Sequence, residues 1–113
     1  MAFQKVINRA VRGPGMFRSP QRTLQAGTRI TVRLDAVWDN VSDMCLFGLE
    51  QLLEDGVTWY HFISAPAYGG DRGKAGALPS ITSGLQEADK LVRLILLLPQ
   101  SMEIGLEIEI NNT

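Results

Sequence analysis

Two stretches of the sequence alternate apolar and polar residues without interruption, and this alternation constrains the fold more than any other feature. The first runs from Arg29 to Trp38 and the second from Met102 to Ile110. A side-chain period of two over this length is expected for a β-strand with one buried face. A helix would distribute the same side chains around its whole circumference. The sequence therefore predicts a small antiparallel β-protein.

Further strands are expected between clusters of turn-forming residues. They cover Phe3 to Val11, Met16 to Ser19, a short stretch near Ile81, and Lys90 to Leu98. The last of these is apolar on nearly both faces, which is typical of a central strand that is covered on each side. Turns are predicted at residues 12–15, 25–27, 86–89 and 99–101.

The segment from Met44 to Glu54 supports two interpretations. Its leucines have helical spacing, and Ser42 could cap a helix. However, Asp55-Gly56 is a favoured two-residue hairpin turn, and the residues from Val57 to Ser64 are rich in β-branched and aromatic types. A hairpin of residues 45–54 with 57–64 accounts for both halves, so we favour strands over a helix.

Residues 65–80 form the longest stretch without a predicted element, and loops of this length are usually functional or mobile. Tyr68, Arg72 and Lys74 lie in this glycine-rich stretch and are candidates for contacts with a partner. The alternative is a solvated loop without a partner.

The chain of 113 residues is predicted to form one all-β domain over residues 1–113. The spacing of the turn signals indicates an antiparallel β-sandwich of six to eight strands, either jelly-roll or immunoglobulin-like. Periodicity does not state strand order, so both topologies stay open.

Basic residues are concentrated at the N-terminal end of the chain. Residues 1–33 contain seven of the eleven bases and none of the twelve acids. One interpretation is that residues 1–28 form a basic arm that contacts an acidic surface of a neighbour. Its candidate contact residues are Arg9, Arg12, Arg18 and Arg22. The other is that basic N-terminal strands pair with the acidic C-terminal strand inside one molecule. Nucleic-acid binding is disfavoured, because this segment has few aromatic residues and the net charge is −1.

The sequence offers no reactive constellation, so we predict no enzyme, no cofactor and no catalytic residue. Cys45 and His61 are the only residues of their types, which excludes an internal disulfide and a metal site built from histidine and cysteine. A nucleophile–base pair would have to use His61, and nothing indicates the third group that such a pair needs. Residues 39–43 could offer oxygens to calcium, but they are also standard turn formers, and no metal site is predicted.

Four aromatic residues could in principle bind a sugar. They are Trp38, Trp59, Tyr60 and Tyr68. Trp38 falls on the apolar face of its strand and is expected in the core, whereas Trp59 and Tyr60 point to opposite faces, so at most one of them can lie on an exposed platform. A carbohydrate-binding module for attachment to a cell surface is the alternative function.

The first residues lack the apolar core and cleavage site of a signal peptide, and no apolar run approaches the length of a membrane span. We therefore expect synthesis in the cytoplasm, no secretion by a signal peptide and no membrane partner.

Three segments carry a resemblance to a known class of proteins. They are RITVRLDAVWDN at residues 29–40, GGDRGK at 69–74 and GLEIEI at 105–110. In general character, the chain resembles the small β-sandwich accessory proteins of tailed bacteriophages, which decorate or cement capsids or sit on tails. The resemblance implies a structural role in the virion without catalysis, with other virion proteins or further copies of the chain as partners. It assigns no individual functional residue.

Overall fold

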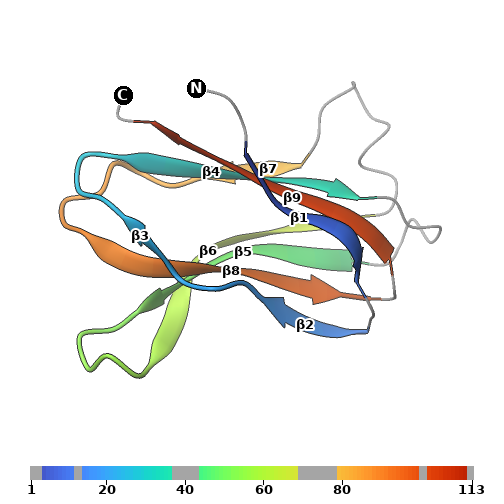
Figure 1. Ribbon diagram of the computed structural model, residues 1–113, viewed down its shortest axis with the longest axis horizontal. Helices are drawn as coiled ribbons and strands as arrows, with labels where there is room; N and C mark the ends of the chain where they lie inside the picture. Colours follow the sequence, from blue (N-terminus) through green and yellow to red (C-terminus); the bar gives the residue numbers. More distant parts are fainter. Residues whose placement is uncertain (1–3, 12–13, 37–43, 69–78, 100–101, 112–113) are drawn as a thin grey trace.

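The computed structural model describes residues 4–11, 14–36, 44–68, 79–99 and 102–111, and these residues form two packed antiparallel sheets (Figure 1). The strands are β1 (Gln4–Val11), β2 (Gly15–Arg18), β3 (Arg22–Leu24), β4 (Arg29–Ala36), β5 (Met44–Leu52), β6 (Trp59–Tyr68), β7 (Ser80–Thr82), β8 (Lys90–Leu98) and β9 (Met102–Asn111). The described residues include no helix long and apolar enough to cross a membrane. The predicted all-β class is confirmed.

Strand order identifies the topology. Sheet A has the order β1-β9-β4-β7, and sheet B has the order β2-β8-β5-β6, with β3 also paired to β8. β2 and β3 pair with successive parts of β8 and so share one place in sheet B. The nine described strands therefore fill eight places in the two sheets. The pairs are nested: β1 with β9, β2 and β3 with β8, β4 with β7, and β5 with β6. This nesting is the jelly-roll arrangement of two Greek keys, which decides between the two topologies that the sequence left open.

Ser19 joins β2 and β3 into one edge of sheet B. Its backbone N–H donates to the Leu94 carbonyl at 2.9 Å, and its hydroxyl accepts from the Leu94 N–H at 2.8 Å. Pro20 follows and has no N–H to donate. The Ser19 side chain therefore continues the hydrogen-bonding ladder across the break at Pro20, where the sequence predicted the end of a strand, whereas β3 beyond it was not predicted.

The core lies between the sheets and consists of the inward positions of each strand. In sheet A, Val32 is the register partner of Ile108, and both are buried. In sheet B, Phe47 is the partner of Leu96, and both are fully buried. The alternation of residues 29–34 and of residues 105–110 therefore identified the buried face of sheet A correctly.

The described part of residues 1–28 belongs to the sandwich of its own chain. β1 pairs with β9 in sheet A, while β2 and β3 pair with β8 in sheet B. These residues are sheet strands rather than an arm that extends from the domain. The alternative prediction was that basic N-terminal strands pair with the acidic C-terminal strand of the same molecule. Arg33 shows such a pair, because its Nε donates to Glu107 Oε1 at 3.1 Å. The β9 carboxylate Glu107 is consequently buried instead of lying on a solvated face.

The hairpin of β5 with β6 was predicted correctly, but its turn and its end were not. Leu53 N donates to Thr58 O at 2.9 Å, which leaves four residues in the turn instead of two. β6 then continues through Pro66 to Tyr68, so the expected loop of residues 65–80 is strand at its beginning. Pro66 is tolerated because β6 is an edge strand.

Candidate functional site

The outer surface of sheet B, named face B here, is the best candidate for a functional site in the described part of the chain. Cys45, Phe47 and Leu49 are fully buried between the sheets, so the alternate residues of β5 point outward. The register of neighbouring strands extends this assignment across the sheet. Its outward residues include Met16, Arg18, Met44, Leu46, Gly48, Glu50, Trp59, His61, Ser64, Pro66, Arg93, Ile95 and Leu97.

An apolar row crosses face B from one edge to the other. Met16 is the register partner of Leu97, Leu97 of Leu46, and Leu46 of Pro66. Met16 is 42% exposed, and Met44, which precedes the row on β5, is 40% exposed. No described strand packs over these residues, and β8 is central in its sheet, but its outward residue Ile95 is only 6% exposed. The outward side of β8 is therefore covered at Ile95 and half-buried at Leu97, so the prediction of a strand covered on each side holds in part.

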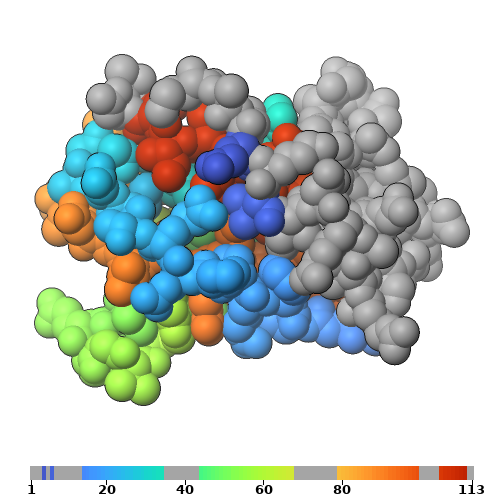
Figure 2. All heavy atoms as spheres, viewed as in Figure 1, coloured from blue at the N-terminus to red at the C-terminus, as the bar shows by residue number. Residues whose placement is uncertain are grey.

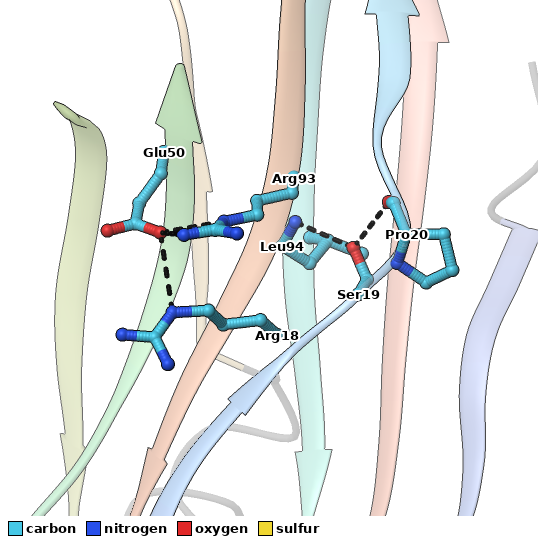
Figure 3. A network of polar contacts seen from close by, with 6 residues as sticks. All are labelled: Arg18, Ser19, Pro20, Glu50, Arg93 and Leu94. Carbon is cyan, nitrogen blue, oxygen red and sulfur yellow. Dashed lines mark hydrogen bonds and ion pairs between the residues drawn. The ribbon is translucent and has the colours of Figure 1, made fainter. Parts of the chain in front are cut away.

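A charged cluster lies beside the apolar row, on β2, β5 and β8 (Figure 3). Glu50 Oε1 accepts from Arg93 Nε at 2.9 Å and lies 2.9 Å from Arg93 Nη2. The same oxygen lies 3.7 Å from Arg18 Nε, and the Arg18 side chain is 48% exposed. Because one carboxylate faces two guanidinium groups, the cluster carries an excess positive charge.

Trp59 and His61 lie on the β6 side of this cluster. The Arg93 guanidinium carbon is 4.2 Å from the centre of the Trp59 ring, a cation–π distance that covers one side of the indole. His61 is exposed, and its Nε2 lies 2.9 Å from Ser64 Oγ. These contacts give face B fixed polar groups beside its apolar row.

The outer surface of sheet A, named face A, is polar by contrast. Thr31 on β4 shares a hydrogen bond of 2.8 Å with Thr82 on β7. Arg33 lies opposite Glu107, and Thr31 lies opposite Glu109. Among the described side chains of face A, Thr31 with Thr82 and Arg33 with Glu107 satisfy one another inside the sheet, and we assign no site to this face.

The pair of Cys45 and His61 does not form. Cys45 faces the core, where burial raises the pKa of its thiol to about 12, whereas His61 lies on face B. A protonated, buried thiol is not a nucleophile at neutral pH. The His61 ring forms a hydrogen bond with the Ser64 hydroxyl instead. Glu50, which is the register partner of His61 on β5, forms an ion pair with Arg93. The structure therefore does not bring a nucleophile, base and orienting acid together at these residues.

The candidate residues from the sequence have separate positions. Arg18 lies on face B, and Arg22 lies in β3 with its Nε buried and unpartnered in the described part. Arg9 and Tyr68 end up in β1 and β6, and Arg12, Arg72 and Lys74 lie outside the described residues. Trp38 and residues 39–43 also lie outside them, and no cluster that could hold a metal is found in the described part.

The apolar row was missed by sequence reasoning, although signals for it were present. Leu97 and Ile95 are outward apolar residues of the doubly apolar strand β8, and Leu46 belongs to the leucines that suggested a helix. Their meeting with Met16 depends on β2 lying beside β8, which the sequence pattern does not state.

The sequence matches no protein-family model and no curated protein, and the structure matches no solved structure.

Proposed function

We propose that this chain is a non-enzymatic structural protein that binds neighbouring protein subunits through face B. The observation that supports this most is the apolar row of Met16, Leu97, Leu46 and Pro66 across the whole width of sheet B. Contiguous apolar surface on a soluble domain commonly marks an interaction site. The adjacent arginines fit the composition of protein interfaces, where arginine and methionine are enriched.

The size of face B favours weak contacts that are repeated. Four strand positions and strands of about nine residues span roughly 600 Å². A stable pairwise interface buries about 800 Å² on each partner. A contact of this size becomes firm when many copies bind at once, as in a shell or a tail.

We place this binding in a virion, as decoration or cement on a capsid or as a tail component, with synthesis in the host cytoplasm. The jelly-roll topology supports the proposal, because it occurs among viral capsid domains, although it is also found in lectins and enzymes. The partners are other virion proteins or further copies of the chain, and neither a membrane nor nucleic acid takes part.

The proposal is tested on the particles of the virus or prophage whose genome encodes this chain. The particles are purified by sedimentation, and the chain is quantified by mass spectrometry against their major subunit. We expect a fixed stoichiometry with many copies per particle. A chain that is expressed but absent from the particles, and that binds none of their purified subunits, would contradict the virion role.

Carbohydrate binding is the second candidate, and the exposure of Tyr60 favours it. Tyr60 is 60% exposed, and it lies on the opposite face of β6 from Trp59, so the two do not form one platform. Calorimetric titration with cell-surface glycans checks this function. Binding that is lost in Tyr60→Ala would support it over subunit binding.

A further inference from the structure

The tip of the β5–β6 hairpin projects from the body of the domain (Figures 1 and 2). Val57 is 78% exposed and Leu53 is 40% exposed, although both are large hydrophobic residues. The neighbouring Glu54 and Asp55 are exposed acids. The tip, residues 53–58, therefore combines an apolar end with negative charge.

The tip has a fixed shape. Asp55 Oδ1 accepts from Val57 N and from Thr58 N, each at 2.9 Å, and Leu53 N donates to Thr58 O at 2.9 Å. Gly56 has a φ of +74°, a conformation that glycine adopts without strain. Because these bonds hold Val57 in place before any partner arrives, binding through the tip costs little conformational entropy.

Face B carries the complementary properties. Its exposed Met16 belongs to the apolar row, and Arg18 projects beside it with a 48% exposed side chain. The charged cluster holds two guanidinium groups against one carboxylate, so it attracts acids. An acidic knob with an apolar end thus matches a basic, apolar surface on the same chain.

From this match we propose that the tip of one copy docks on face B of a second copy, with Val57 against Met16 and Glu54 toward Arg18. The inference rests on the proposed function, for which it names a partner: the chain itself. The contact is heterologous, because the tip and face B are different surfaces. Each copy keeps one free tip and one free face, so the contact builds rings or rows instead of closed pairs.

A symmetric contact of face B with another face B is less favourable. It would place the same arginine-rich cluster on both sides of the interface, and the excess positive charge would repel across it. The tip-to-face contact brings opposite charges together and leaves each Glu50 with its own arginines.

Three matched variants test the contact. Val57→Ser changes the tip, Met16→Ser changes face B, and Leu85→Ser changes a 48% exposed leucine in the β7–β8 connection as a control. Circular dichroism and the unfolding midpoint establish that each variant is folded. Sedimentation velocity over a concentration series then gives the dissociation constant for self-association.

We expect wild type and Leu85→Ser to associate beyond a dimer. Val57→Ser and Met16→Ser should each weaken association by roughly tenfold, which corresponds to about 1.4 kcal/mol. An equimolar mixture of these two variants should regain one contact of wild-type strength, because one variant keeps an intact face B and the other an intact tip. Heterodimers should therefore form at the wild-type concentration, and larger species only at higher concentration.

Charge reversal gives a second, independent readout. Arg18→Glu and Glu54→Lys should each weaken association, and their mixture should recover it, with the strongest recovery at low salt. A mixture that associates no better than either variant alone would overturn the contact. Association of Val57→Ser at wild-type strength, or a wild type that stays monomeric at all concentrations, would overturn it as well. These results would contradict the contact between copies but not the proposed binding to other virion subunits. That binding is tested separately by the stoichiometry of the purified particles.

Discussion

The two outer faces of the sandwich differ in how their side chains are satisfied. On face A, Thr31 bonds to Thr82 and Arg33 bonds to Glu107, so polar groups of adjacent strands saturate one another. On face B, an apolar row lies open beside a cluster with more arginine than carboxylate. Both sheets share one core, so folding alone does not require this difference. The comparison supports the proposal that face B, rather than face A, is the surface that binds protein.

The largest expected effect concerns the space above Gly48, in the middle of face B. A Cβ at this position would meet the Ile63 carbonyl oxygen and would lie 2.6 Å from Ser64 Cα, both of which are backbone atoms. Gly48→Ala should therefore lower the free energy of unfolding by about 3 kcal/mol. Gly84→Ala is the control, because nothing lies within 4 Å of its Cβ position. Urea unfolding of both variants measures the difference, and equal stabilities would show that β6 does not press on β5 as described.

The ion pairs of the two faces provide a sharper comparison. Glu50 holds two arginines on face B, whereas the Glu107 pair on face A has one arginine, Arg33. Glu50→Gln should lower the free energy of unfolding by about 2 kcal/mol, because two guanidinium groups then lie together without a carboxylate. Glu107→Gln should lower the free energy of unfolding by about 1 kcal/mol. Urea unfolding at low and high salt gives both values, and a larger loss for Glu107→Gln would reverse the ranking of the two faces.

The hairpin tip belongs to neither face and adds an acid-sensitive element. Hydrogen bonds from the Thr58 side chain, and then from the backbone of Thr58 and Val57, lower the pKa of Asp55 below its ordinary value of 3.8. This stabilisation is present above pH 3.8 and is lost as the pH falls through the lower, folded pKa. Asp55→Asn should make the unfolding midpoint less dependent on pH in this acid range. A wild-type dependence that the variant keeps unchanged would show that other carboxylates cause it.

The smallest expected effect concerns the thiol of Cys45, which is buried between the two sheets. We expect a thiol reagent not to label it in the native protein. Burial raises the pKa of Cys45 from 9.0 to about 12, so the thiol stays protonated at neutral pH. Stability linked to this shift is complete below pH 9.0 and declines as the pH rises toward 12. Native protein should not react with a thiol reagent at pH 8, while unfolded protein should react with one equivalent. Rapid labelling of the native protein would mean that the core opens readily.

The sequence predicted the inner side of the sandwich better than its outer side. Alternation identified the buried residues of β4 and β9, because burial of one face imposes a period of two. It did not reveal β3, since three residues carry too little pattern, nor the end of β6, since Pro66 suggested a loop. Face B could not be predicted either. Its apolar row joins four strands whose order depends on long-range pairing, and no local signal places Met16 beside Leu97.

Oxidation of methionine tests the central claim most directly, since Met16 and Met44 are both on face B and both about two-fifths exposed, at 42% and 40%. Hydroxyl radicals oxidise exposed methionine readily, and mass spectrometry locates the product. The chain is footprinted free and in its assembled state, with Leu85 as an internal reference on another surface. The account predicts that assembly protects Met16 and Met44 and leaves Leu85 unchanged. Equal oxidation of both methionines in the free and assembled states would contradict the assignment of face B as the interface.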